Sequence, residues 1–452
     1  MRSLFAFALI TVPLAAAPLT PEQTKAIDAA ANATLTKTGV PAVSIAIVRD
    51  GKIAYAKAYG MQRAGQPAVA DARYEIASIS KQFTAAALLL LAEDGKLSLD
   101  DPVGKYLPNL TRANDVKVRQ LLSHTSGYRD FWPQDFPFAD MQKPTTPTGI
   151  LDRWAKAPLD FEPGARWQYS NTGYVAAGMI VEKVAGKPLL DFLYERVFTR
   201  LGMHPVDQDT GMTAADPVGH HRFALGPVRP ADPPAPGWLY AAGELAMTAS
   251  DLARWDISVI ERSVMKPASY DDQQRTVLLS DGTSSGYGLG VDVETIKGHR
   301  RISHGGEAVG FLSENRIFPE DKAAIVVLDN ADFGDAHTAI ADAIQDILLA
   351  DSGDTSRARS VYAALREGRI DRDAFTANGN FFFTAQVLAD YRASLAPLGE
   401  PKSFVRTSSG LRGGFTSEVY KIDFGTRKLT LVVRAEPGAK GRIEQFTVYP
   451  AS

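Results

Sequence analysis

The sequence predicts an α+β protein with two domains. Strand-like segments lie at both ends of the first 350 residues and helical or loop-like segments lie between them. This order favours a sheet covered by helices together with an all-helical lobe. After a polar stretch without periodicity at 350–357, two helical and four strand-like segments predict a small C-terminal α+β domain at 358–452. A length of 452 residues fits two domains of these sizes.

The first elements expected are a helix and a hairpin. Thr20-Pro21 is typical of a helix start, because threonine caps the backbone and proline suits the first helical position. It predicts a helix over 21–37. Two strand-like segments, 43–48 and 53–59, flank Asp50-Gly51, a dipeptide typical of tight hairpins.

The next segment, from Ser78 to Asp94, is apolar on nearly every side and therefore predicts a buried helix. Residues 100–260 are mainly helical and loop-like. Strand patterns follow at 286–294, 300–303, 311–318 and 323–329, and an amphipathic helix is predicted at 336–350. In the C-terminal domain, helices are predicted at 359–367 and 384–396, and strands at 402–407, 412–424, 427–435 and 442–449.

The N-terminus has the features of a secretory signal peptide at 1–17. Arg2 supplies a positive charge, residues 4–14 are apolar, and 15–17 are the small residues that a signal peptidase accepts. Cleavage would leave a mature first domain at 18–350. No later segment reaches the roughly 18 consecutive apolar residues of a membrane span. We therefore expect a periplasmic or secreted protein with no integral membrane segment after cleavage.

Composition narrows the function classes. The chain is 45% hydrophobic and 22% charged with a formal net charge of -3, which is ordinary for a globular enzyme and leaves no basic surface for nucleic acid. It has no cysteine, which excludes disulfides, thiolate metal sites and a cysteine nucleophile. The expected partner is a small-molecule or peptide substrate, and no cofactor or metal is expected.

The first candidate catalytic residues are Ser78 and Lys81. Positions i and i+3 share one face of a helix, so the hydroxyl and the amine can meet. Serine is a weak nucleophile without an adjacent base. A lysine withdrawn from water loses part of its preference for the charged form and can accept the serine proton. Ser-x-x-Lys alone is a weak signal, because it occurs by chance in many chains.

Two further motifs carry candidate groups. Tyr169 and Asn171 lie in Tyr-Ser-Asn, where a nearby lysine would favour the tyrosine phenolate and so a general base, and the amide would hold the lysine and a substrate carbonyl. His304-Gly305-Gly306 lies at a strand, where glycines allow close approach of a ligand. The imidazole could donate to a substrate carboxylate or to the tyrosine oxygen. Taken singly, the two motifs also fit a plain turn and a glycine bend.

Together, the ordered triplet resembles the serine β-lactamase-like, penicillin-recognising hydrolases: class C β-lactamases, D-alanyl-D-alanine carboxypeptidases, D-aminopeptidases and related esterases. Connecting segments such as Leu121-Leu-Ser-His-Thr-Ser-Gly127 and Tyr287-Gly-Leu-Gly290 agree with it. The resemblance covers about residues 21–350. It implies a β-lactamase/transpeptidase-like fold, an antiparallel sheet flanked by helices with a helical lobe.

The resemblance also implies roles. Ser78 would be the nucleophile, with Lys81 and Tyr169 as the acid/base pair. Backbone N–H groups of Ser78 and Glu307 would form the oxyanion hole. Substrate-binding positions would be Asn171, His304, Gly305, Gly306 and Glu307.

The third motif departs from the family. β-Lactamases of this kind usually have Lys-Thr-Gly where this chain has His304-Gly305-Gly306, and an imidazole is a weaker carboxylate anchor at pH 7. We therefore expect a serine hydrolase that forms an acyl-enzyme with small esters, D-amino-acid peptides or amides, and acts weakly on β-lactams. A true class C-like β-lactamase and a penicillin-binding sensor without turnover are the alternatives. The oligomeric state and the role of 358–452 are left open.

Overall fold

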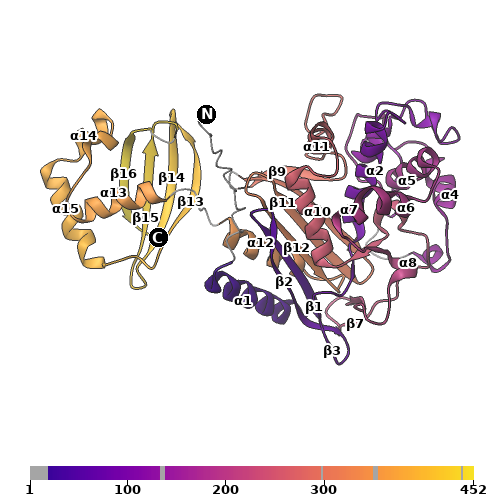
Figure 1. Cartoon of the computed structure of the whole chain (residues 1–452), viewed down its shortest axis with the longest axis horizontal. Coiled ribbons are helices and arrows are strands. Elements are labelled where there is room, and N and C mark those ends of the chain that lie inside the picture. Colours follow the sequence, from indigo (N-terminus) through magenta and orange to yellow (C-terminus); the bar gives the residue numbers. More distant parts are fainter. Residues whose placement is uncertain (1–18, 133–137, 297–298, 350–354, 439–440, 452) are drawn as a thin grey trace, which may run out of the picture. The chain divides into compact units, whose positions relative to one another are not determined.

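The computed structural model describes residues 19–132, 138–296, 299–349, 355–438 and 441–451. The predicted signal peptide at 1–17 and most of the predicted linker at 350–357 lie outside these residues, so both stay predictions. The described chain forms two compact units (Figure 1). The larger comprises the residues up to 294 with 300–343, and the smaller comprises 295–299 with the residues from 344 onward.

A seven-stranded sheet forms the centre of the larger unit, in the order β3-β2-β1-β12-β11-β10-β9. The paired strands from β3 to β12 and from β12 to β10 are antiparallel, with Ile45 opposite Val327 in the middle. The strands are β1 (Ala42–Arg49), β2 (Lys52–Arg63), β3 (Gln66–Pro67), β9 (Asp292–Ile296), β10 (His299–Ala308), β11 (Phe311–Phe318) and β12 (Ala323–Asp329). The predicted antiparallel sheet is confirmed.

Helices cover both faces of this sheet, so its central strands are buried. All seven residues of β12 are buried, and α10 packs against both β1 and β12. In Figure 1, α1 and α12 lie on one face of the sheet and α10 lies on the other. Their bounds are α1 (Pro21–Thr38), α10 (Ala249–Glu261) and α12 (Ala336–Leu348). As predicted, Thr20 caps α1, with a capping box to Gln23.

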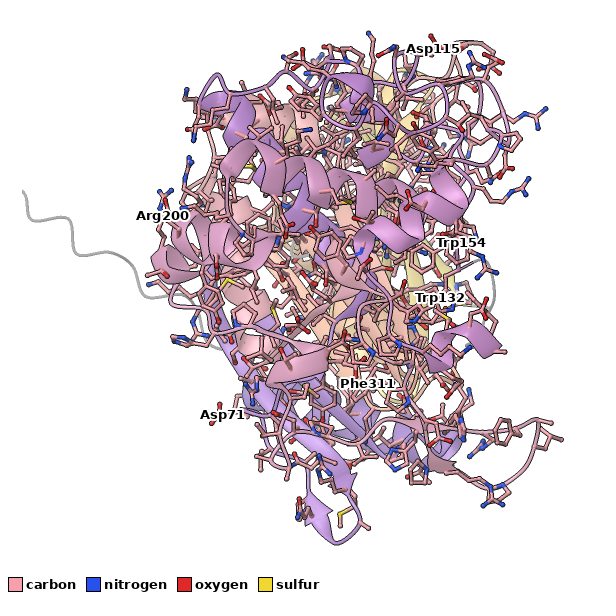
Figure 2. The ribbon with its side chains drawn as sticks, turned by 90° about the vertical axis from the view of Figure 1, so that its right-hand side faces the viewer. Asp71, Asp115, Trp132, Trp154, Arg200 and Phe311 are labelled. Atoms are coloured by element: carbon pink, nitrogen blue, oxygen red, sulfur yellow. The ribbon has the colours of Figure 1, made fainter. Side chains whose placement is uncertain are left out.

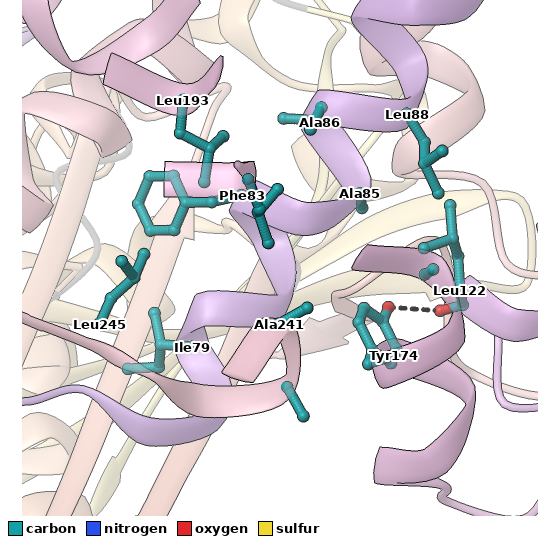
Figure 3. Close-up of a cluster of buried hydrophobic side chains, with 14 of the residues drawn as sticks. Ile79, Phe83, Ala85, Ala86, Leu88, Leu122, Tyr174, Leu193, Ala241 and Leu245 are labelled. Atoms are coloured by element: carbon teal, nitrogen blue, oxygen red, sulfur yellow. Dashed lines mark hydrogen bonds between the residues drawn. The ribbon is translucent and has the colours of Figure 1, made fainter. Parts of the chain in front are cut away.

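A helical lobe surrounds α2 (Lys81–Glu93), whose first eleven residues, Lys81 to Leu91, are all buried. In Figure 3, Phe83 and Leu88 of α2 lie in a cluster of buried hydrophobic side chains with Ile79, Leu122, Tyr174, Leu193, Ala241 and Leu245 from other segments. The other helices of the unit are α3 (Val118–Leu122), α4 (Pro147–Ile150), α5 (Asn171–Ala185), α6 (Leu189–Leu193), α7 (Thr199–Leu201), α8 (Gln208–Gly211), α9 (Tyr240–Gly243) and α11 (Pro267–Gln273). In the described part of the chain, no helix has the length and apolarity to span a bilayer.

The larger unit also contains two small sheets. In the first, β8 (Leu245–Met247) pairs with β4 (Tyr74–Glu75) on one side and with β5 (Val206–Asp207) on the other. The second is a hairpin of β6 (His220–His221) and β7 (Arg229–Pro230). Because β4 ends just before Ser78, the first of these sheets helps to place the segment that carries the candidate nucleophile.

The smaller unit is a separate α+β structure, as the sequence predicts. Its sheet has the order β13-β14-β15-β16 and a core that includes Phe404, Tyr420, Leu431 and Phe446. The strands are β13 (Ser403–Arg412), β14 (Phe415–Asp423), β15 (Lys428–Ala435) and β16 (Ile443–Pro450), and the helices are α13 (Ser356–Arg366), α14 (Ala377–Phe382) and α15 (Ala385–Leu395). The short helix α14, capped by Thr376, is not among the predicted elements.

Candidate active site

Ser78 lies in a single 3-10 turn, Ala77–Ser80, directly before α2. The expectation of a continuous helix from Ser78 is corrected here. Ala77 has a φ of 46°, which no α-helix accommodates, and the bond from the Ile79 N–H to the Ile76 carbonyl closes a tighter turn. Side chains at i and i+3 eclipse one another in such a turn. Lys81 Nζ therefore lies 2.8 Å from Ser78 Oγ.

The amine of Lys81 is fully buried and touches three oxygens. Besides Ser78, Nζ donates to Asn171 Oδ1 at 2.8 Å and to the Ala242 carbonyl at 2.7 Å. Burial lowers the pKa of Lys81 to about 7, although the charge of Asp130 acts in the opposite direction. Near pH 7, the Lys81 amine is therefore neutral in about half of the protein molecules.

In the neutral amine, hydrogen bonding determines where the lone pair points. The Ala242 carbonyl and Asn171 Oδ1 can only accept, so they take the two N–H groups of a neutral Lys81. The lone pair is left facing Ser78 Oγ, whose hydroxyl then donates to it. This is the arrangement that a general base needs before it removes the serine proton.

Asp130 orients Asn171 and is a site residue that sequence reasoning missed. Its Oδ1 accepts the Asn171 backbone N–H at 2.9 Å, and its Oδ2 accepts the Asn171 side-chain Nδ2 at 3.3 Å. The amide is thereby turned with its oxygen toward Lys81. Asp130 lies in a loop without periodicity or a motif, so nothing in the sequence marked it.

Tyr169 lies at the same serine. Its phenol is hydrogen-bonded to Ser78, and Lys81 Nζ lies 4.9 Å from the centre of its ring. Burial raises the pKa of Tyr169 above the usual range, because a buried phenolate is costly. The expectation that the neighbouring lysine would favour the phenolate is thus corrected: burial outweighs it, and Tyr169 holds its proton.

His304 lies beside Tyr169 at the same site, but its two ring nitrogens have different hydrogen-bond partners from those expected. Nδ1 lies 2.5 Å from the Gly305 carbonyl, which can only accept, so the proton is on Nδ1. Nε2 lies 2.8 Å from the Tyr287 hydroxyl and accepts from it. Burial, with the charge of Lys81, lowers the pKa of His304 to about 3. The expectation that His304 donates to Tyr169 or to a substrate carboxylate is therefore corrected. The imidazole is neutral, and both of its nitrogens are hydrogen-bonded, to the Gly305 carbonyl and to the Tyr287 hydroxyl.

The two glycines of the third motif differ in their surroundings. A Cβ on Gly306 would lie 2.2 Å from the Ile76 carbonyl and 2.2 Å from Ser313 Oγ, whereas one on Gly305 would have no neighbour closer than 3.7 Å. Ser313 Oγ also donates to the Ile76 carbonyl at 3.1 Å. Strand β10 can therefore approach the Ser78 segment only because position 306 has no side chain.

A cavity of about 660 Å³ opens above these groups. Ser78, Tyr169 and Asn171 line it, and so do all four residues from His304 to Glu307. Its wall also includes Trp132, which lies on the same side of the molecule as Trp154 in Figure 2. The structure thus brings every predicted site residue to one place, with Lys81 beneath the cavity.

The lining of the cavity includes three acidic residues, and the partly charged Lys81 lies beneath it. Asp130, Glu307 and Asp332 line it, and among its described lining residues there is no lysine or arginine. Asp332 comes from the segment after β12, and its Oδ2 accepts the Gly310 N–H at 3.0 Å. The cavity is therefore unfavourable for a substrate carboxylate and favourable for an ammonium group.

Residues 27–349 match the protein family described as Beta-lactamase. The chain belongs to the β-lactamase family. The match spans most of the chain and includes every candidate site residue, as the resemblance of the three motifs predicts. The family and the fold are those of a serine hydrolase.

Curated relatives carry several names. The chain is 28% identical over 298 residues to a penicillin-binding protein of Bacillus subtilis (strain 168), covering 62% of this chain and 66% of that one. It is 28% identical to a D-aminopeptidase of Cereibacter sphaeroides over 67% of this chain and 58% of that one. It is 35% identical to esterase EstB of Burkholderia gladioli over 41% of this chain and 50% of the esterase. The chain spans less than two thirds of the length of these relatives.

Solved structures agree on the fold. A D-stereospecific amidohydrolase from Streptomyces sp. is 28% identical with a TM-score of 0.62, covering 71% of this chain and 97% of that one. A penicillin-binding protein homologue from Pyrococcus abyssi matches 95% of this chain and 96% of its own chain, with a TM-score of 0.62 and 20% identity. The second likeness concerns the fold alone.

Proposed function

We propose that this protein is a hydrolase that forms an acyl-enzyme at Ser78 and cleaves small esters and amides of D-amino acids. The observation that carries the proposal is the contact between a buried Lys81 amine and Ser78 Oγ, 2.8 Å apart, at the floor of the cavity. The pKa of Lys81, about 7, supplies the neutral base that this chemistry needs at physiological pH.

In acylation, Ser78 Oγ attacks the substrate carbonyl carbon while its proton passes to Lys81 Nζ. The carbonyl oxygen becomes an oxyanion, for which we assign the backbone N–H groups of Ser78 and Glu307. Tyr169 gives its phenolic proton to the leaving nitrogen or oxygen as the bond to carbon breaks. The lysine ammonium then returns a proton to the phenolate.

Deacylation repeats these transfers with water. Water attacks the acyl carbon while its proton passes to Lys81; the bond from the acyl carbon to Ser78 Oγ then breaks, and Lys81 gives that proton to Ser78 Oγ as the acid product leaves. Asn171 and the strand segment from His304 to Glu307 hold the substrate in this scheme. Positioning and proton transfer together account for the chemistry without any further group.

The substrate class follows from the charges. A neutral His304 and three lining carboxylates give no anchor for the carboxylate of a β-lactam, whereas they attract the free ammonium of an amino-acid amide or ester. The D-aminopeptidase and D-stereospecific amidohydrolase among the relatives support D stereochemistry. β-Lactams are then poor substrates.

Labelling and turnover on one preparation test the proposal. A fluorophosphonate should add to Ser78, as peptide mass spectrometry would show, and the Ser78→Ala variant should not be labelled. The wild-type protein should hydrolyse p-nitrophenyl acetate and D-alanine p-nitroanilide, and should cleave the L isomer and the N-acetylated anilide much more slowly.

Other outcomes would replace the proposal. A far higher kcat/KM for a chromogenic cephalosporin than for the anilide would make the protein a β-lactamase. A stable penicillin adduct without turnover of any substrate would make it a sensor. If Ser78 is not labelled, both the proposed hydrolase and the alternative of a β-lactamase are contradicted.

Export to the periplasm or out of the cell is part of the proposal and rests on the composition of residues 1–17. Cell fractionation with N-terminal sequencing would test it. A protein that retains Met1 in the cytoplasmic fraction would contradict export.

A further inference from the structure

His124 holds the backbone on both sides of Tyr169. Its carbonyl accepts the Gln168 N–H at 2.9 Å, and its ring Nδ1 accepts the Ser170 N–H at 3.0 Å. The residue itself has a φ of 58°, in the left-handed region, and is fully buried. One residue thus makes hydrogen bonds with both neighbours of the candidate acid.

The imidazole also packs against the tyrosine ring. The ring centres of His124 and Tyr169 are 4.1 Å apart, with 30° between the planes. Lys81 Nζ lies 4.9 Å from the centre of the same tyrosine ring. The position of the phenol over Ser78 therefore depends on contacts with the imidazole of His124 and the amine of Lys81 as well as on its backbone.

The imidazole of His124 is neutral. Burial lowers its pKa well below the usual range, and the nearby charge of Lys81 lowers it further. An Nδ1 that accepts an N–H carries no proton, so the proton is on Nε2. Nε2 makes no hydrogen bond among the described residues. His124 is thus poorly suited to exchange protons with Ser78, and its contacts point to another role.

We propose that His124 is a positioning residue that holds the phenol of Tyr169 against Ser78. The inference rests on the proposed function, in which Tyr169 transfers a proton. It goes beyond that function because His124 acts only through Tyr169 and is absent from the lining of the cavity. Loss of the ring contact would let the phenol move relative to Ser78, and a displacement of about 1 Å costs on the order of 100-fold in rate.

The variant His124→Asn removes the imidazole, and with it the ring contacts to Tyr169 and to Trp167, Tyr174 and Tyr287. Asparagine tolerates a left-handed backbone and its Oδ1 can accept the Ser170 N–H, so the variant keeps the backbone and removes the ring. We expect kcat for D-alanine p-nitroanilide to fall by about 10- to 100-fold with KM changed less than about twofold. Thermal unfolding of each variant checks that it is folded.

Coupling to Tyr169 distinguishes positioning from a general structural role. In the Tyr169→Phe background, adding His124→Asn should change kcat less than about threefold, because the proton that His124 positions is already missing. The same loss in both backgrounds would overturn the inference. A second variant, His124→Gly, tolerates the left-handed backbone and also removes the ring, and it is compared in the same two backgrounds if His124→Asn does not fold.

Failure of the inference and failure of the proposed function are separable. If wild-type protein is labelled at Ser78 and hydrolyses the anilide, and the His124 variants do so at the wild-type rate, only the inference is wrong. If the wild-type protein shows neither labelling nor hydrolysis, the proposed function is wrong, and with it the role assigned to His124.

Discussion

At the scale of single residues, burial determines the chemistry of this site. Lys81 and Tyr169 are both removed from water, and burial favours the neutral form of each. For the lysine this creates a base near pH 7, and for the tyrosine it preserves a proton. The same effect therefore gives the two groups opposite roles, which supports the order of proton transfers proposed above.

The pH dependence of acylation should follow Lys81. Below pH 7 the amine gains a proton and loses its lone pair, so kcat/KM for p-nitrophenyl acetate should fall about tenfold per pH unit; above pH 7 it should level off. Lys81→Ala should lower kcat/KM by at least about 100-fold. A profile that keeps rising to pH 10 would show an unshifted lysine.

Replacing Tyr169 should affect amides more than activated esters. An amide nitrogen must be protonated to leave, whereas p-nitrophenolate leaves without help. We expect Tyr169→Phe to lower kcat for the anilide of D-alanine about 100- to 10,000-fold and kcat for p-nitrophenyl acetate much less. Equal losses on both substrates would assign Tyr169 a role other than that of the acid.

A cation at position 304 should change the substrate preference. His304→Lys places an ammonium on β10 next to a cavity whose described lining includes Asp130, Glu307 and Asp332 but no lysine or arginine. We expect the ratio of kcat/KM for a chromogenic cephalosporin to that for p-nitrophenyl acetate to rise about tenfold or more, as one charge-assisted hydrogen bond would allow. His304→Gln serves as the neutral control and should leave the ratio low.

Sequence patterns predicted the reactive residues and the lowered pKa of a buried Lys81, but not the protonation of Tyr169. The Ser78–Lys81 spacing and the three motifs bring the right side chains together, because these signals are local or shared with a family. Asp130 and His124 act through contacts between loops, which have no periodicity. The prediction that Lys81 favours the phenolate of Tyr169 was wrong, because burial raises the pKa of the phenol and the extent of burial is a property of the folded chain.

At the scale of elements, the approach of β10 to the Ser78 turn depends on one missing side chain. Gly306→Ala would bring a Cβ to 2.2 Å from the Ile76 carbonyl, so the strand or the turn must shift. We expect a loss of about 1–3 kcal/mol in unfolding free energy and a large loss of acylation. Denaturant titration and ester hydrolysis would measure them.

Gly305→Ala is the matched control for this prediction. Its Cβ would have no neighbour closer than 3.7 Å, so stability and ester hydrolysis should stay close to those of the wild type. If the two alanine variants behave alike, close packing at position 306 is not what determines the position of β10.

Most elements were predictable because their signals are local. Thr20-Pro21 and Asp50-Gly51 gave α1 and the β1–β2 hairpin, and the apolar segment after Ser78 gave the buried helix α2. The 3-10 turn at Ala77–Ser80 was not predictable, because it follows from a left-handed alanine and from contacts with α9, β11 and β8. Tertiary contacts overrode the helical pattern there.

At the scale of the whole molecule, the main hydrophobic core of the larger unit and the core of the smaller unit have no residue in common among the described residues. Leu88 belongs to the core of the larger unit and Leu431 to that of the smaller one, and both are fully buried. Leu431→Ala should destabilise the smaller unit by about 2–5 kcal/mol, through lost burial and a residual cavity. Calorimetry should show two transitions, of which this variant lowers one and Leu88→Ala the other. A single transition lowered by both variants would contradict independent unfolding.

The hydrogen bonds of Lys81 to the Ala242 carbonyl and Asn171 Oδ1 have a consequence for turnover. Both acceptors are held by the folded chain, so the orientation of the amine is set when the protein folds and not when substrate arrives. Little reorganisation then separates the resting enzyme from its reactive geometry. The position of Lys81 should therefore be the same in a structure of the acyl-enzyme as in the structure without substrate. Diffusion of substrate and product through the mouth of the cavity then becomes a larger part of what limits the rate.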